Sequence, residues 1–290
     1  MLCREGIDRW NRLRFGLVLS GGGAKGAYEA GAVRAMRQLD VANRIYGVSG
    51  TSVGALNTLV FAMNDGAMLE SLWENVGLTT VVSPHKNSEG ESRSIRDLLT
   101  QITGQLDEDQ GFCTQDSLRR LIQDTCDFSI IRSHRAKLFA CAYDIGAKNV
   151  TYFDLKELSD EEMVNAVLAS AAIPHVYDPV TVLGRKYADG GINDPVYGIK
   201  NSDVTPIYPL QDEDYDIMIV IHLREQENRD ITHIGKTRLL HVYPSRAIEP
   251  VKGTGTMLFT KSAIRDRLSL GYSDMCVSLS SLLMEYLKED

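Results

Sequence analysis

Short apolar runs alternate along the chain with segments in which apolar residues recur at helical spacing. The runs at 15–19, 45–48 and 217–221 predict buried strands. The segment 24–39 follows the first run and has apolar residues on one helical face, which predicts a helix. The alternation continues from residue 15 to about 223 without a repeat or a low-complexity linker. It predicts an α/β fold of three layers, with a mainly parallel central sheet and helices on both faces.

The length of 290 residues allows one large domain or two of ordinary size, and the unbroken alternation favours one. We expect this domain at 15–274, after an N-terminal arm at 1–14. The segment 275–290 predicts an amphipathic helix, whose apolar face would pack on the domain or form a homodimer or membrane contact. The most polar stretch, 83–111, predicts an insertion, which could act as a lid or be a surface excursion without function.

A glycine-rich loop joins the first predicted strand to the first predicted helix. Gly21, Gly22 and Gly23 follow the run 15–19 directly. The first N–H groups of a helix and of the loop before it have no partner within the helix, so such a loop binds negative charge. In an acyl-transfer enzyme that charge is the oxyanion of a tetrahedral intermediate. Gly22 and Gly23 are the candidate donors.

The same loop also fits a different class of protein. Gly21, Gly23 and Gly26 match the G-x-G-x-x-G fingerprint of dinucleotide-binding enzymes. That function requires an acidic residue at the end of the second strand to hold the ribose hydroxyls. Here the second strand ends in Ser49-Gly50-Thr51-Ser52, and Asp40 precedes the strand. The sequence therefore favours an oxyanion hole over a nicotinamide or flavin site.

A candidate nucleophile, Ser52, follows the second predicted strand. It lies in the sequence Gly-Thr-Ser-Val-Gly between the apolar run 45–48 and a helix-like segment. A serine held on a sharp turn between a strand and a helix is exposed to substrate, and Gly50 and Gly54 allow that turn to pack closely. A plain turn is the alternative interpretation of the motif alone.

A candidate base, Asp189, lies at the end of a predicted hairpin, followed by Gly190 and Gly191. Asp-Gly-Gly is an ordinary turn sequence. Beside a candidate nucleophile, however, a carboxylate can accept the serine proton if burial raises its basicity.

The alternative base is a histidine after Asp189, namely His222, His233 or His241. His222 is the strongest of these because it ends the apolar run 217–221. Against it, Ser52 follows only the second strand and the glycine loop follows the first, which differs from the order in ordinary α/β-hydrolases. The order of the motifs favours a Ser-Asp dyad.

The glycine-rich loop, G-x-S-x-G and D-G-G, in this order, resemble the patatin-like phospholipases. The segments 138–144 and 166–174 resemble two further blocks of that family, and Asn-Asp-Pro at 193–195 fits its Asn-x-Pro. The resemblance covers about 15–274. It implies a patatin-like three-layer fold and the hydrolysis of fatty-acyl esters in lipids, as by a phospholipase A, through an acyl-enzyme. The implied roles are nucleophile for Ser52, base for Asp189, oxyanion loop for Gly21, Gly22 and Gly23, and supporting glycines at Gly50, Gly54, Gly190 and Gly191.

Two residues depart from the commoner pattern of that family. Lys25 stands where many members have arginine, which keeps the charge but loses the planar fork of a guanidinium. His175 follows Pro174 where glycine is common. We expect His175 to be a structural histidine, with a place at the border of the acyl pocket as the alternative.

The charge balance limits the classes of partner. Lys and Arg number 31 against 39 Asp and Glu, a net charge of −8, which argues against nucleic acid and against electrostatic docking on anionic membrane. The arm at 1–14 combines Trp10 with four arginines and could touch a lipid surface, although a solvated arm is the more ordinary expectation. We expect a phospholipid or other acyl lipid as substrate, reached by transient contact with a membrane surface. A homodimer or an activating partner, without which the protein would be silent, stays open.

The remaining residue types predict no cofactor. The five cysteines lack C-x-x-C spacing and are expected as reduced thiols, and the histidines show no metal-ligand spacing. The sequence predicts hydrolysis without a metal. It contains no apolar core of a signal peptide and no apolar run near the ~20 residues that span a bilayer. We expect a soluble, cytoplasmic protein.

Overall fold

The computed structural model describes residues 4–63, 66–84, 113–195, 198–225, 231–251 and 254–288. Nearly all of the predicted insertion at 83–111 lies outside these residues. A lid there stays a prediction.

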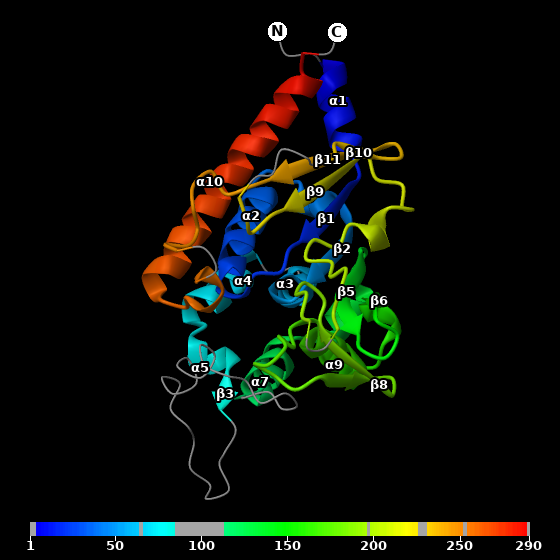
Figure 1. The fold of residues 1–290 in the computed structure, drawn as a ribbon. Helices are drawn as coiled ribbons and strands as arrows, with labels where there is room; N and C mark the ends of the chain where they lie inside the picture. Colours follow the sequence, from blue (N-terminus) through cyan, green and yellow to red (C-terminus); the bar gives the residue numbers. More distant parts are fainter. Residues whose placement is uncertain are drawn as a thin grey trace, which may run out of the picture.

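A central sheet organises the described residues, with the strand order β10-β11-β9-β1-β2-β5-β8-β7 and β6 paired to β5 (Figure 1). The neighbours from β11 to β5 are parallel, and β6, β7, β8 and β10 pair antiparallel. This confirms the predicted α/β fold with a mainly parallel sheet. The strands are β1 (Phe15–Leu19), β2 (Ile45–Thr51), β5 (Lys137–Asp144), β6 (Asn149–Asp154), β7 (Val180–Val182), β8 (Arg185–Asp189), β9 (Ile217–Ile221), β10 (His233–Ile234) and β11 (Thr237–Val242), with β3 (Ser83–Pro84) and β4 (Cys113–Thr114) in a separate pair.

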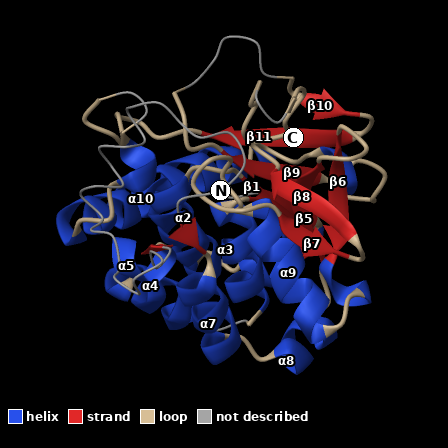
Figure 2. Ribbon diagram, turned by 60° about the horizontal axis from the view of Figure 1, so that its bottom comes forward, coloured by secondary structure: helices blue, strands red, loops and turns tan. Residues whose placement is uncertain are grey.

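Most of the described helices lie together against one side of the sheet (Figure 2). The α-helices are α1 (Arg4–Arg12), α2 (Ala27–Gln38), α3 (Val53–Ala62), α4 (Gly66–Asn75), α5 (Leu78–Val81), α7 (Asp116–Thr125), α8 (Phe128–Ser133), α9 (Asp160–Ser170) and α10 (Lys261–Tyr286). The 3-10 helices are η1 (Gly23–Gly26), η2 (Ala42–Arg44), η3 (Leu155–Glu157), η4 (Tyr208–Leu210) and η5 (Gly255–Met257).

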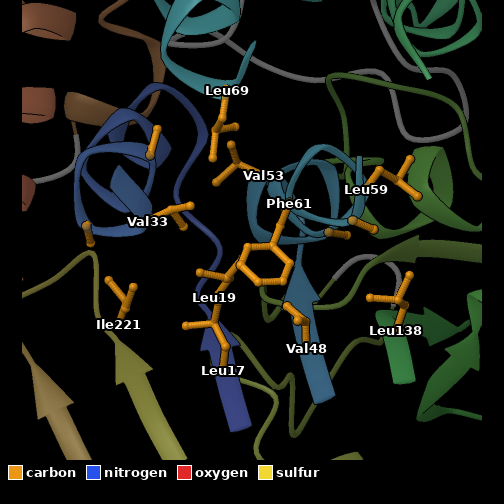
Figure 3. Close-up of a cluster of buried hydrophobic side chains, with 14 of the residues drawn as sticks. Leu17, Leu19, Val33, Val48, Val53, Leu59, Phe61, Leu69, Leu138 and Ile221 are labelled. Carbon is orange, nitrogen blue, oxygen red and sulfur yellow. The ribbon is translucent and has the colours of Figure 1, made fainter. Parts of the chain in front are cut away.

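Strand β1 is apolar on both faces because both of its faces are covered. Leu17 and Leu19 of β1 belong to the main core, which contains side chains of α2 and α3 (Figure 3). Val18 points to the opposite face and packs in a second cluster with Leu210 of η4 and Tyr215. Alternate residues of a strand point to opposite faces, so a continuous apolar run fits a strand buried on both.

The first and last described helices pack together. The residues expected as a solvated arm include α1, whose Trp10 is buried and packs edge-to-face on Phe15 and on Tyr286 of α10. The described part of this segment is therefore a short helix anchored by Trp10 and not a free arm, although most of its residues, its arginines included, are exposed to solvent. Trp10 is buried while the arginines stay at the surface, where Arg9 lies over the Tyr286 ring.

Helix α10 crosses α2 at very short range. A Cβ on Gly31 would lie 1.9 Å from the Leu268 carbonyl oxygen, and a Cβ on Gly271 would lie 1.9 Å from that of Tyr28. Glycine at both positions lets the two backbones touch. The predicted apolar face of the C-terminal segment is part of this packing, because Leu279 and Leu282 are buried in the core. Within the described part of the chain, no helix has the length and apolarity that crossing a membrane requires.

Candidate active site

The sheet brings Ser52 and Asp189 together along one edge of β5. Strand β2 runs parallel to β5 and ends with Thr51 opposite Cys141. Strand β8 runs antiparallel to β5 and ends with Asp189 opposite Ala142. Strand β6 occupies the other edge of β5 at the same positions, so β2 and β8 must share one edge. Their carboxyl ends therefore point toward each other and meet where Ser52 follows β2.

Ser52 has a strained backbone at the turn between β2 and α3. Its φ is 57° and its ψ is −122°, a conformation that is costly for a residue with a Cβ. The turn is tight: a Cβ on Gly50 would lie 2.2 Å from the carbonyl of Gly54, and one on Gly54 would lie 2.4 Å from that of Leu19. The motif glycines are therefore required by close packing of strand, turn and helix, as the sequence predicted.

Ser170, at the end of α9, holds this turn from the other side. Its hydroxyl accepts the backbone N–H of Ser52 at 2.8 Å and donates to the Cys141 carbonyl at 2.5 Å. Ser170 is completely buried. The resemblance of the 166–174 block implied no role for an individual residue. Ser170 acts by binding the backbone of Ser52, and the sequence carries no signal for such a contact.

Asp189 is a buried carboxyl with one oxygen available. Its Oδ1 accepts the N–H of Gly191 at 2.8 Å, while Oδ2 has no hydrogen-bond donor at normal geometry among the described residues. Burial raises the pKa of Asp189 to about 6, although the Gly191 N–H and the nearby Ser52 side chain lower it in part. At neutral pH this carboxyl is mostly ionised and is a stronger base than an exposed aspartate.

The glycine loop lies beside Ser52. A Cβ on Gly21 would lie 3.4 Å from Cβ of Ser52, and the Gly21 N–H donates to the Val204 carbonyl at 2.8 Å. Gly22 and Gly23 donate no backbone hydrogen bond among the described residues. Gly23 has φ 56°, and a Cβ there would lie 2.4 Å from the Thr256 carbonyl oxygen. Gly22 and Gly23 thus remain the candidate donors, because Gly21 already has an acceptor.

The backbone of residues 203–206 connects all three motifs, and we call this segment the strut. It receives the N–H of Gly21, as above, and the hydroxyl of Thr51, which donates to the Asp203 carbonyl at 2.7 Å. The Asp203 N–H donates to the Gly190 carbonyl at 2.7 Å. The Thr205 hydroxyl lies 2.9 Å from that of Ser20. The sequence did not reveal the strut, because most of its contacts use backbone groups that any residue possesses.

His222 lies two strands away from Ser52. It follows β9, which pairs with β1, and β1 pairs with β2. Adjacent strands are about 4.8 Å apart, so the two residues end strands separated by roughly 10 Å. The Nε2 of His222 lies 2.8 Å from Nδ1 of His241, and its ring stacks on Tyr243 at 4.1 Å. The third candidate, His233, lies on β10 and is exposed.

Two charged residues flank the site. The Lys25 Nζ lies 3.9 Å from Glu249, and burial lowers the pKa of the lysine. The Arg267 guanidinium is buried and donates to the carbonyls of Ala24 and Gly255, among others. Residues from α10 and from the segment before it therefore hold the loop from outside the motifs.

His175 pairs with Asp194, with 2.8 Å between Nε2 and Oδ2. Its φ is 65°. This contact to the loop after Asp189 agrees with the expected structural role.

An apolar cavity of about 110 Å³ opens beside Ser52. Side chains of α3, α4 and α7 form most of its wall, among them Leu56, Val60, Leu69, Trp73 and Ile122. Asn57 is a polar residue of this wall. An apolar chain fits such a lining better than a nucleotide does.

The end of β2 also lacks the feature that a dinucleotide site requires. Ser49 and Thr51 stand there and donate to the strut carbonyls, so no carboxylate stands where a ribose would need one. Among the described residues, no cluster of metal-ligating side chains is present.

Comparisons with known proteins identify the family of the chain. The family model described as patatin-like phospholipase matches residues 17–197. A search of curated proteins returned no match. The human GIVD cytosolic phospholipase A2, solved with methyl gamma-linolenyl fluorophosphonate, aligns over 94% of this chain with a TM-score of 0.51 and 12% identity.

Two bacterial structures also match. VipD of Legionella pneumophila aligns over 93% of the chain with a TM-score of 0.43 and 12% identity, and the ExoU–SpcU complex of Pseudomonas aeruginosa over 94% with 0.46 and 17%. The chain spans 67% of VipD, 59% of the human enzyme and 52% of ExoU. Because the family model covers well over half of its residues, the chain belongs to the patatin-like phospholipases, a family of lipid ester hydrolases.

Proposed function

We propose that the chain is a phospholipase A-like acyl hydrolase that works through a Ser52–Asp189 dyad and an acyl-enzyme. The observation that carries the proposal is the meeting of β2 and β8 on one edge of β5. It places a serine on a strained turn next to a buried carboxyl whose pKa is raised to about 6.

The first half of the reaction forms the acyl-enzyme. Asp189 Oδ2 accepts the proton of the Ser52 hydroxyl as Oγ attacks the ester carbonyl carbon. The N–H groups of Gly22 and Gly23 stabilise the oxyanion, and one such donor is typically worth about 100- to 1000-fold in rate. The tetrahedral intermediate then collapses, and the protonated Asp189 gives its proton to the leaving alcohol.

The second half releases the fatty acid. Asp189 accepts a proton from water as that water attacks the acyl carbonyl, and then returns the proton to Ser52 Oγ as the acyl–oxygen bond breaks. The apolar cavity supports an acyl chain as the bound part of the substrate, with lining residues that offer it few polar groups. The enzyme would take such a chain from a lipid surface. We propose that it contacts that surface only transiently.

Labelling by a fluorophosphonate tests the nucleophile without the natural lipid. The wild type, S52A and D189N are incubated with the probe, and the mass of each intact protein is then measured by mass spectrometry. We expect one adduct on the wild type, none on S52A and much slower labelling of D189N. An adduct on S52A would show that another residue is the nucleophile.

The alternatives make different predictions in the same experiment. A dinucleotide-binding oxidoreductase would leave the probe unreacted and would purify with bound nicotinamide or flavin. A folded wild type that is labelled only after addition of phospholipid vesicles or a second protein would be a conditionally active enzyme.

A further inference from the structure

A second buried carboxyl near the site has no part in the proposed mechanism. Glu29 lies on α2, just after η1, and is completely buried. Its Oε1 accepts the backbone N–H of Ser20 at 2.7 Å. Ser20 directly precedes the glycine loop, so this carboxyl holds the residue from which the loop begins.

The other oxygen of Glu29 faces the wall of the apolar cavity. Oε2 accepts the Nδ2 of Asn57 at 2.8 Å. The Oδ1 of Asn57 accepts the indole N–H of Trp73 at 3.0 Å. We call this buried chain of hydrogen bonds, Ser20–Glu29–Asn57–Trp73, the relay.

The direction of each hydrogen bond in the relay is fixed by chemistry. The backbone N–H of Ser20 and the indole N–H of Trp73 can only donate, so Glu29 and Asn57 Oδ1 must accept. This determines which way the Asn57 amide points, and its Nδ2 also donates to the Gly26 carbonyl at 3.1 Å. Burying so many polar groups is costly unless each has a hydrogen-bond partner. If these residues only filled space, apolar side chains would do so at a lower cost.

The relay joins two parts of the site that a substrate occupies together. Asn57 and Trp73 line the apolar cavity with Ser52. Trp73 also lies close to Gly26 at the end of η1, the 3-10 helix that follows the glycine loop, because a Cβ on Gly26 would lie 3.0 Å from Trp73 Cζ2. A chain packed against the cavity wall therefore contacts two residues of the relay, and Glu29 connects them to the loop.

We propose that Glu29 is a positioning residue that couples occupancy of the acyl cavity to the placement of the oxyanion loop. The proposal rests on the proposed hydrolase function. Its consequence is that an acyl chain in the cavity accelerates the acylation of Ser52 and does not only strengthen binding.

Three variants follow from the hydrogen-bond directions. In E29Q the new amide meets the Nδ2 of Asn57, donor against donor, and turning Asn57 over only moves the conflict to the Trp73 N–H. In N57D two carboxyl groups face each other. In E29Q/N57D the new amide at position 29 donates to the new carboxylate at position 57, which accepts from Trp73, so only the bond to the Gly26 carbonyl is lost.

The experiment compares p-nitrophenyl acetate with p-nitrophenyl octanoate, with active sites counted by fluorophosphonate titration. The burst of p-nitrophenol, or kcat where acylation is rate-limiting, gives the acylation rate, and its concentration dependence gives the apparent binding constant. We expect octanoate to be acylated faster than acetate by the wild type. In E29Q this advantage should fall by roughly 10-fold or more, with little change in binding, because small displacements of catalytic groups are costly. The double variant should recover most of the advantage.

A matched control and a milder variant complete the test. D144N changes another buried carboxyl to an amide at a point outside the relay and should keep the octanoate advantage. If E29Q does not fold, W73F removes the indole donor together with part of a ring that lines the cavity. Its apparent binding constant reports the change in the wall, and the coupling predicts a selective loss in the acylation rate of octanoate beyond that change. Equal losses on both esters, or none, in the folded variants would overturn the coupling. A wild type that hydrolyses neither ester and takes up no probe would instead overturn the proposed function and the coupling with it.

Discussion

Asp189 and Glu29 are both buried carboxyls beside the same glycine loop, yet only one is placed to act as a base. Glu29 accepts a hydrogen bond from an N–H group on each of its oxygens. Asp189 accepts one on Oδ1 and keeps Oδ2 without a donor at normal geometry among the described residues. Burial raises the pKa of Asp189 to about 6 and that of Glu29 to about 8. The comparison teaches that burial raises the pKa of both carboxyls, whereas only Asp189 keeps an oxygen without a donor at normal geometry, which is what its proposed role as the base of Ser52 requires.

The largest effect should come from D189N. The Gly191 N–H needs an acceptor, so the new amide nitrogen would occupy the position of Oδ2 and could not take the serine proton. We expect kcat for ester hydrolysis to fall by about 100- to 10,000-fold, the usual contribution of a general base. D194N is the matched control, because it makes the same change in the loop that follows Asp189, at a carboxyl that pairs with His175. A D189N variant with more than a tenth of wild-type activity would contradict the dyad.

The pH dependence separates the two carboxyls. Asp189 must be ionised to act, so kcat/KM should rise with pH and level off above about 6. Both groups have raised pKa values when folded, so each favours the folded state at low pH and loses that contribution as pH rises. Relative to D189N, the wild type should lose stability between about pH 4 and 6. Relative to E29Q, the wild type should lose stability between about pH 4.5 and 8. Urea denaturation midpoints over this range measure both windows.

The sequence predicted the parts of the site that depend on side-chain type. The apolar runs gave β1 and β9 with the observed bounds, and the glycine motifs gave turns that the structure shows to be sterically required. Ser52 and Asp189 could be proposed as nucleophile and base because that chemistry uses few residue types, and the structure brings the ends of their two strands together.

The supporting contacts could not be predicted in the same way. The strut acts mostly through backbone groups, which leave no mark in a sequence. Glu29 occupies a position in a helical pattern where a glutamate ordinarily faces water, and only the fold shows that it is buried. The helical arm was missed because the partner of Trp10, Tyr286, lies at the other end of the chain.

A smaller effect is expected from S170A. The change leaves the buried N–H of Ser52 without its acceptor, at a cost of about 1–3 kcal/mol in stability. The strained Ser52 turn would then shift, and fluorophosphonate labelling should slow by roughly 10-fold. S129A removes an exposed hydroxyl in the first turn of α8, which bonds to Asp127 before that helix, and should label at the wild-type rate. Unchanged labelling of S170A would show that the two glycines of the turn suffice to hold Ser52.

The smallest effect on activity should come from H222A, although His222 is buried and ends a strand of the same sheet. Its contacts with His241 and Tyr243 hold it to β11 and the residue after that strand, and β11 is three strands from β2 and Ser52. We expect a lower melting temperature from the lost stacking and an unchanged kcat per labelled active site. A folded H222A that loses hydrolysis, beside a D189N that keeps it, would transfer the role of base from the aspartate to the histidine. The paired result therefore decides between the two bases, because each variant leaves the other candidate in place.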